Sequence, residues 1–341
     1  MDISAMSKKK RRPILDYLVY LAVRTIVCIV QALSVEMAYA LARGIAWILH
    51  RVDARHRKIA LENLQAAYGD ALSEAERQRI VRGVYLHFCM MLMEMILSPR
   101  RFWLNTWRGY VRVTNQAPLI SKMLSGGPSI VLSGHFGNWE MAGYLFGVFG
   151  FDSFAVARKL DNEYLDNYLQ RFRQRTGQTI IPKKGGFDQM VEVLRHGRTL
   201  VILGDQDAGP NGLFVDFFGR PASTHKAIAL LAIENQAPIF VVYARRLGDR
   251  FAYEIGIEDV IDPAEFAGSS SDVRDITQRF TSALERVVRR DPEQYLWLHR
   301  RWKHQPKPRG RKARAAAAAV EAEAAATGAT AISVSATNPE A

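Results

Sequence analysis

Few cysteines are present, and their scarcity excludes several classes of protein. The 341-residue sequence contains two, Cys28 and Cys89, each inside an apolar segment. Such a pair argues against a disulfide-stabilised scaffold and suits a reducing compartment. The sequence also lacks the Cys/His spacings of zinc sites, so a zinc-finger type of domain is excluded.

A nucleophile motif is missing as well. No Gly-x-Ser-x-Gly elbow occurs in the sequence, and neither cysteine lies in a loop near the histidine motif described below. A hydrolase that forms a covalent acyl-enzyme on serine or cysteine is therefore disfavoured.

Acidic residues are fewer than basic ones. The 34 Asp and Glu residues are outnumbered by 46 Lys and Arg residues, which gives a formal net charge of +12. An excess of this size favours a polyanionic partner, which is a nucleic acid, an anionic membrane or an acidic protein. The length and the apolar fraction of 48% allow one large or two small domains with a full hydrophobic core.

The N-terminal part of the chain has the composition of a membrane-associating segment. A basic segment at 1–12 precedes an apolar run that extends from Ile14 to Leu49. The charge order is that of a signal peptide, but no small-residue cleavage site follows a short apolar core, so we expect the segment to be retained. We expect residues 13–50 to form a hydrophobic helix that associates with a membrane.

The charge of Arg24 lies in the middle of this apolar run. Tyr17–Leu33 is close to the minimum spanning length, and an arginine at the bilayer centre costs roughly 2.5–3.5 kcal/mol on insertion scales. Arg24 also belongs to a polar stripe at helical spacing, which we expect to face the rest of the protein. The stripe contains Asp16, Tyr20, Arg24, Cys28 and Gln31. A single span and an interfacial helix both remain open, with an ordinary buried helix as the alternative.

Helix-like and strand-like segments follow. Residues 55–97 have a helical pattern that breaks near Gly69 and restarts at a capping box from Ser73 to Glu76. The later strand-like segments are 129–133, 154–157, 179–181, 199–203, 238–245 and 251–257, and helix-like segments include 163–175, 188–195, 226–235 and 272–290. This alternation predicts an α/β fold with a mainly parallel central sheet flanked by helices.

The central motif of the sequence is a histidine at the end of a strand. The apolar run Ser129–Ser133 leads into Gly-His-x-Gly and then into a helix-like segment, so His135 lies where α/β folds place their chemistry. Glu140 follows five residues later. If His135 is in the loop and Glu140 in the first helical turn, with Asn138 as the N-cap, the carboxylate can bond the imidazole. A histidine held in this way is a general base. The alternative is a loop histidine beside a helix-capping acid.

These residues resemble a known signature. The stretch Gly-His-Phe-Gly-Asn-Trp-Glu at 134–140 is similar to the His-x-x-x-x-Asp/Glu box of the glycerophosphate acyltransferase superfamily, and its Glu form resembles the bacterial lipid A lauroyl/myristoyl acyltransferases. The block 205–224 resembles the Asp-x-Asp-x-Gly-Pro … Phe-Val-x-Phe-Phe-Gly-x-Pro-Ala-Ser/Thr segment of the same family. The end at 295–303 resembles the family's closing Trp-x-x-x-Arg-Phe/Trp-Lys segment. Resemblance extends over about residues 15–304.

The resemblance implies roles for further residues. Asp205 or Asp207 is expected to be needed for activity, and Arg220 with the aromatic segment 214–218 to border the acceptor. Arg158 and Arg175 are expected to hold the acidic head group or the donor, although many basic residues only solvate a surface. The usual donor of the family is acyl carrier protein, and acyl-CoA would be attracted equally well. We expect no cofactor, and no metal at the two aspartates because further ligands are missing nearby.

The expected organisation is a basic segment at 1–12, a membrane helix at 13–50, an acyltransferase domain at 51–304 with a glycerophosphate acyltransferase-like fold, and a disordered basic and Ala-rich tail at 305–341. In the expected reaction, His135 held by Glu140 deprotonates a lipid hydroxyl, which attacks a fatty acyl thioester at the cytoplasmic side of a bacterial inner membrane. The acceptor is open between a lipid A precursor, a lysophospholipid, a phosphoinositide mannoside and an aminolipid. A nucleic-acid-binding protein and a catalytically silent membrane scaffold are the alternatives from other classes.

Overall fold

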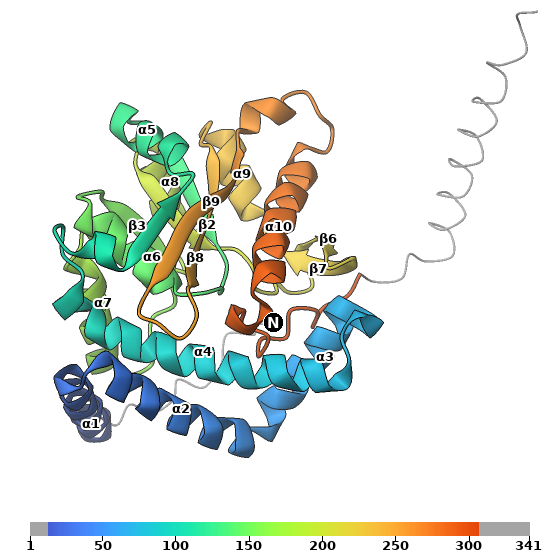
Figure 1. Ribbon diagram of the computed structural model, residues 1–341. Helices are drawn as coiled ribbons and strands as arrows, with labels where there is room; N and C mark the ends of the chain where they lie inside the picture. The colour runs from blue at the N-terminus through green and yellow to red at the C-terminus, as the bar shows by residue number, and fades with distance from the viewer. Residues whose placement is uncertain (1–12, 307–341) are drawn as a thin grey trace, which may run out of the picture. The chain divides into compact units, whose positions relative to one another are not determined.

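A seven-stranded sheet lies at the centre of the chain (Figure 1). The computed structural model describes residues 13–306, so the basic segment at 1–12 and all but the start of the expected tail lie outside the described residues. The strand order is β1-β9-β8-β2-β5-β3-β4, and every neighbouring pair except β8 and β9 is parallel. The strands are β1 Val111–Thr114, β2 Ser129–Ser133, β3 Ser153–Ala157, β4 Gln178–Pro182, β5 Thr199–Leu203, β8 Ile239–Arg246 and β9 Tyr253–Ile261. The predicted α/β class is confirmed.

Helices cover both faces of this sheet. Strand β2 is buried on both sides: Val131 belongs to one core cluster, and Ile130 and Leu132 belong to the other, because successive strand residues point to opposite faces. The helices that follow α4 are α5 Ala117–Ser125, α6 Trp139–Val148, α7 Glu163–Gln174, α8 Phe187–Arg195, α9 Ala227–Glu234 and α10 Asp272–Arg290. The second cluster is completed by side chains of α8, α9 and α10.

A small antiparallel hairpin stands apart from the main sheet. It consists of β6 Leu213–Phe217 and β7 Arg220–Thr224, and it forms most of the second sequence block. Its two-residue turn has φ of 56° at Phe218 and 70° at Gly219, which is the backbone of a type I′ turn. The aromatic run 214–218, expected to border the acceptor, is largely a strand, and Phe217 and Phe218 are buried.

Four helices form the N-terminal layer: α1 Pro13–Ala32, α2 Val35–Val52, α3 Ala54–Tyr68 and α4 Glu74–Arg101. The segment 13–50, expected as one helix, is divided into α1 and α2 because Ser34 caps a new helix, its hydroxyl accepting from the N–H of Met37 at 3.2 Å. The capping box of Ser73 and Glu76 starts α4 as predicted. Helix α4 lies between the sheet and the α1–α2 pair (Figure 1).

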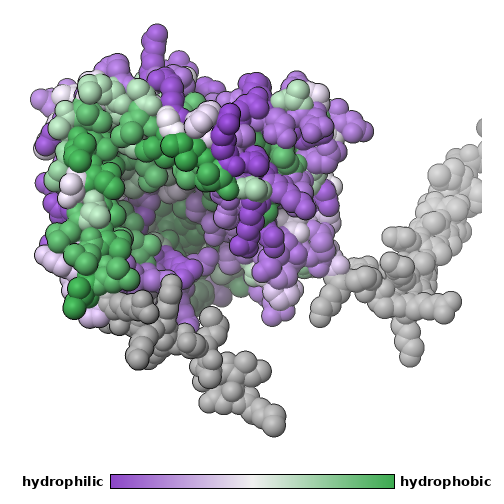
Figure 2. Space-filling model, turned by 90° about the horizontal axis from the view of Figure 1, so that it is seen from below, coloured by the Kyte–Doolittle hydropathy of each residue, from purple (hydrophilic) through white to green (hydrophobic). Residues whose placement is uncertain are grey.

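Helices α1 and α2 present an apolar surface to the outside. Both α1 and α4 are long and apolar enough to cross a membrane, but 61% of the α4 window is buried against 11% for α1. Helix α4 is thus a core helix. Helices α1 and α2 carry many exposed large apolar side chains. These are Ile14, Leu15, Leu18, Val19, Leu21, Ile26, Ile29, Met37, Leu41, Trp47, Ile48, Leu49 and Val52. Figure 2 shows apolar residues gathered in a band along one side of this face, next to a hollow.

Candidate active site

Two strand ends bring a histidine and an aspartate together. Strands β2 and β5 are parallel neighbours, and Ser133 is paired with Leu203 at their carboxyl ends. His135 and Asp205 each follow two residues later, so both leave the sheet at the same edge. The N–H at Nδ1 of His135 donates to Oδ1 of Asp205 at 2.8 Å, and the backbone N–H of His135 donates to Oδ2 at 2.7 Å. One carboxylate therefore fixes both the ring and the loop that carries it.

This contact corrects the expected role of Glu140. The carboxylate that bonds His135 is Asp205, whereas Glu140 in the first turn of α6 pairs with Arg173 of α7. The Nε–H of Arg173 donates to one Glu140 oxygen at 3.0 Å, and its Nη2 donates to the other, which makes a two-point contact. Asp205 takes Nδ1 because its strand lies directly beside β2, while α7 places a cation opposite Glu140.

The environment of His135 suits a general base. Burial lowers the pKa of His135, but the charge and hydrogen bond of Asp205 outweigh burial, so the pKa is raised above its ordinary value; Lys183 lowers it and Glu140 raises it. With Nδ1 donating to Asp205, the lone pair is on Nε2. The side-chain amide nitrogen of Gln206 lies 3.4 Å from Nε2 and is placed to donate to it. The Trp139 ring stands edge-on to the imidazole, with 5.0 Å between centroids.

The loop after His135 is held by backbone contacts that require a glycine. Gly137 donates to the carbonyl of Gln294 at 2.9 Å, and Asn138 donates to the carbonyl of Ala244 at 2.8 Å. Gly137 has a φ of 59°, and a Cβ there would stand 1.9 Å from the Ala244 oxygen, so no other residue fits. The N–H of Leu296 donates to the His135 carbonyl at 3.1 Å. The closing sequence motif thus packs on the histidine loop.

Comparison with known proteins gives the family. A model of the bacterial lipid A biosynthesis acyltransferases matches residues 5–304. The chain belongs to this family. It is an acyltransferase, and His135, Glu140 and Asp205 lie within the matched region.

Individual relatives are distant. The chain is 27% identical over 297 residues to the lipid A biosynthesis lauroyltransferase of Escherichia coli K12, covering 85% of this chain and 93% of the relative. It is 27% identical over 222 residues to the phosphatidylinositol mannoside acyltransferase of Mycolicibacterium smegmatis, covering 61% of this chain and 70% of the relative. A crystal structure of the 1-acyl-sn-glycerophosphate acyltransferase of Thermotoga maritima aligns with 74% of this chain and 98% of its own, at 13% identity and a TM-score of 0.34.

A buried polar network lies beneath the histidine loop of the acyltransferase. Glu94 of α4 is 0% exposed and accepts three hydrogen bonds. Its Oε1 accepts from the Tyr39 hydroxyl at 2.7 Å and from Nη1 of Arg246 at 3.0 Å, and its Oε2 accepts from the Asn138 amide at 2.8 Å. Asn138 also caps α6, as predicted, by accepting from the N–H of Met141 at 3.0 Å. The network therefore ties α2 and α4 to the start of α6.

His87 continues this network to the loop. Burial, followed by the charge of Arg246, lowers the pKa of His87 far below its ordinary value, so the ring is neutral. Its Nε2–H donates to the Gly137 carbonyl at 3.1 Å, and its Nδ1 accepts from Nη2 of Arg246 at 3.0 Å. Sequence reasoning missed His87 and Glu94, although their seven-residue separation places both on one side of an apolar helix.

Asp207 has a different role from Asp205. Its Oδ2 accepts from Nδ1 of His304 at 2.6 Å and from the N–H of Gly209 at 3.2 Å, and its own N–H donates to Nε2 of His299 at 3.2 Å. These contacts shape the loop after β5. In the described range 13–306, no three His, Cys, Asp or Glu side chains are grouped so as to hold a metal ion.

The three arginines assigned by resemblance lie outside the His135–Asp205 contact. Arg158 pairs with its neighbour Asp161 at 3.6 Å and keeps 81% of its side chain exposed. Arg220 lies 6.0 Å from the ring centroid of Trp302, and Arg175 lines a cavity between α1, α4 and α7. Within the described part of the chain, none of them forms a hydrogen bond or ion pair with His135. Arg173, which sequence reasoning did not select, is the arginine that reaches the histidine box.

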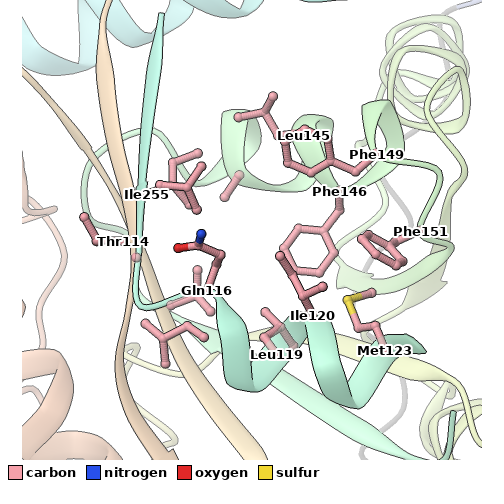
Figure 3. Close-up of a pocket in the computed structure, with 15 residues that line it drawn as sticks. Thr114, Gln116, Leu119, Ile120, Met123, Leu145, Phe146, Phe149, Phe151 and Ile255 are labelled. Carbon is pink, nitrogen blue, oxygen red and sulfur yellow. The ribbon is translucent and has the colours of Figure 1, made fainter. Parts of the chain in front are cut away.

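A separate apolar cavity of about 70 Å³ lies farther along α6. Phe146 of α6 and Phe149, which caps the C-terminal end of α6, face Leu119 and Met123 of α5 across it (Figure 3). The proposed site residues are not among the described side chains that line it. Its walls are apolar, so we expect it to stay dry.

Proposed function

We propose that this acyltransferase moves a fatty acyl chain from an acyl thioester to a hydroxyl group of a glycolipid acceptor of lipid A type. The observation that carries the proposal is the His135–Asp205 pair, in which Nδ1 is bound to the carboxylate and Nε2 carries the lone pair of a base. Membership of the lipid A biosynthesis acyltransferase family and similarity to the lauroyltransferase of E. coli support the acceptor class.

The proposed reaction needs no covalent enzyme intermediate. Nε2 of His135 removes the proton of the acceptor hydroxyl while Asp205 stabilises the imidazolium that forms. The alkoxide attacks the thioester carbonyl, and a tetrahedral oxyanion results. When it collapses, the carbon–sulfur bond breaks and the leaving thiolate takes the proton from His135. A positioned base of this kind contributes about 10²- to 10⁴-fold in rate.

The oxyanion requires donors near the histidine. The first turn of α6 begins at Trp139, directly after the histidine loop. The first N–H groups of a helix have no partner within the helix and carry its positive dipole end. We therefore assign the oxyanion to the N-terminus of α6, with the Glu140–Arg173 pair holding α6 against α7.

The apolar surface of α1 and α2 supports a membrane location. We propose that this surface lies in a bacterial inner membrane with the catalytic domain on the cytoplasmic side. The net charge of +12 would attract both anionic lipids and an acidic donor such as acyl carrier protein, with acyl-CoA as the other candidate donor. Nothing in this arrangement needs a cofactor.

A second acceptor class has its own support. The similarity to a phosphatidylinositol mannoside acyltransferase favours a mannosylated phosphoinositide as the other candidate acceptor.

Lipid mass spectrometry tests both. Cells that express the wild type are compared with cells that express His135→Ala at equal protein level. A lipid that gains one acyl chain only with the wild type identifies the acceptor. If the lipids are the same in both strains although the wild type is present in a host that makes both candidate acceptors, the proposed function is wrong.

A further inference from the structure

A large cavity lies between α1 and the catalytic domain. Its volume is about 800 Å³, and its walls come from α1, α4 and α7. This is within the usual range of small-molecule sites, about 300–1,000 Å³. The polar stripe expected on α1 faces this cavity, since Tyr20, Arg24, Cys28 and Gln31 all line it.

The charge of the lining has one sign. Arg24 of α1 and Arg171 and Arg175, at the end of α7, line the cavity, and none of its described lining residues is Asp or Glu. Three guanidinium groups without a carboxylate between them repel one another unless an anion binds. A phosphate group is the anion that fits several guanidinium donors at once.

Arg24 is held in place but is not saturated. Its Nη1 donates to the Tyr20 hydroxyl at 3.1 Å, and its guanidinium carbon lies 4.7 Å from the centroid of the Tyr168 ring. Its Nε is buried and has no hydrogen-bond partner within the described range. The side chains of Arg171 and Arg175 are exposed and form no hydrogen bond or ion pair with residues 13–306. The three groups therefore retain donors for a ligand.

The cavity adjoins the catalytic loop through two helices. On α7, Arg173 lies between Arg171 and Arg175 in sequence and pairs with Glu140 of the histidine box. On α4, Met95 and Ile96 line the cavity directly after Glu94, the residue that holds Asn138. The two helices that line the cavity thus also carry residues that hold the segment after His135.

The outer side of α1 indicates the source of the ligand. Leu18 and Ile29 are 55% and 57% exposed on the same helix, so a bilayer that covers them would meet the mouth of the cavity. We propose that the cavity binds the phosphate-bearing head group of an anionic lipid and presents that lipid to His135. This inference rests on the proposed function, because it makes the bound lipid the acyl acceptor. Binding of this head group would also offset the energetic cost of placing Arg24 in an apolar helix.

Cys28 provides a local readout of occupancy. Its exposed thiol lines the cavity, whereas Cys89, the other cysteine of the chain, is buried. The full-length protein in neutral detergent is alkylated with iodoacetamide, and the rate at each cysteine is followed by peptide mass spectrometry. We expect dihexanoyl phosphatidic acid to slow alkylation of Cys28, with dihexanoyl phosphatidylcholine much weaker. Equal protection by both lipids, or none, would overturn the proposal.

Variants test the arginines directly. Arg171→Gln and Arg175→Gln should each weaken protection by dihexanoyl phosphatidic acid about tenfold, the usual effect of one charge-assisted hydrogen bond. Arg24→Gln should do the same. If Arg24→Gln misfolds, the variants of the exposed Arg171 and Arg175 still test the proposal. Arg195→Gln is the matched control, because it removes an equal charge from the exposed end of α8. In this variant, phosphatidic acid should protect Cys28 as strongly as in the wild type. Unchanged protection in Arg171→Gln and Arg175→Gln would contradict the assignment.

Two further measurements distinguish a lipid ligand from a soluble anion, and the cavity proposal from the proposed function. Inorganic phosphate or coenzyme A protecting as well as the lipid would identify a soluble anion and overturn the lipid assignment. His135→Ala should bind phosphatidic acid normally, because the cavity does not include the base. Protection by phosphatidic acid, together with identical lipids in cells that express the wild type and His135→Ala, would refute the acceptor role and the proposed function while leaving the anion site. Transfer without protection would refute the cavity alone.

Discussion

Replacing Asp205 with asparagine removes the charge beside His135 and keeps the shape of the side chain. In the wild type, Oδ2 accepts the backbone N–H of His135 at 2.7 Å and Oδ1 accepts from Nδ1 at 2.8 Å. Asparagine has a single oxygen. If that oxygen keeps the backbone N–H, the amide NH2 faces Nδ1 and can only donate to it. The imidazole proton must then move to Nε2, which is the atom that has to act as the base.

The expected loss is large. Without a usable base, kcat should fall by about 10²- to 10⁴-fold, which corresponds to about 3–5 kcal/mol of transition-state stabilisation. The pH profile should change as well. Burial lowers the pKa of His135 and Asp205 is the main group that raises it, so the variant has a lower His135 pKa. Because the neutral imidazole is the active form, the acid limb of kcat/KM should move to lower pH.

Initial rates of thioester consumption over about pH 5 to 9, where histidine titrates, give both quantities. Asp207→Asn is the matched control, since its carboxylate in the same loop accepts from His304 at 2.6 Å and not from His135. That variant should leave the acid limb in place. Wild-type kcat with an unmoved acid limb in Asp205→Asn would refute the reasoning, and so would an equal shift in Asp207→Asn. Thermal unfolding of each variant separates loss of catalysis from loss of fold.

Further variants test the residues that support the site and the apolar surface of α1 and α2. Gly137→Ala should abolish activity, because the added Cβ would stand 1.9 Å from the Ala244 oxygen. Gly150 also has a positive φ but has open space around it, so Gly150→Ala is the control and should keep activity. Measurement of kcat distinguishes the two variants. Glu94→Gln should destabilise by about 3–5 kcal/mol in denaturant unfolding, because Arg246 is left without its buried carboxylate, and Tyr39→Phe by about 0.5–3 kcal/mol; equal stability to the wild type would exclude a role for the network. Replacing Leu18, Ile29 and Trp47 with Gln should release the protein from vesicles without changing its unfolding midpoint, and a variant that still pellets would move the anchor elsewhere.

Much of the fold could be predicted because its signals are local. The capping box at Ser73, the N-cap at Asn138 and the amphipathic helix α10 depend on residues within a few positions of each other. The polar stripe on α1 likewise predicted which side faces the protein. Its role as a cavity wall depended on α7, which is about 140 residues farther along the chain and carries no local sign of that contact.

The pairing of His135 with Asp205 could not be predicted because strand order is not local. The glycines that flank His135 and the strand-to-helix setting of the motif favoured Glu140 as its partner. The sheet instead places β5 beside β2, although β3 and β4 come between them in sequence. The aspartate was available to sequence reasoning through its own motif, and the two motifs each follow a strand end. Only the neighbour relation of the two strands, set by the crossover connections, was missing.

Glu140 provides the sharpest test of this revised arrangement. Asp205 is the main group that raises the pKa of His135, and the Glu140 charge adds a smaller contribution in the same direction. Glu140→Gln removes this smaller contribution and leaves Arg173 without its ion pair, at a cost of about 1–3 kcal/mol in stability. The acid limb should move to lower pH while Nδ1 stays bound to Asp205, so kcat should fall far less than in Asp205→Asn. Arg173→Gln breaks the same pair but keeps the Glu140 charge, so its acid limb should not move down. If Glu140 were instead the residue that orients the imidazole, Glu140→Gln would match Asp205→Asn in kcat, and Arg173→Gln would leave the rate unchanged.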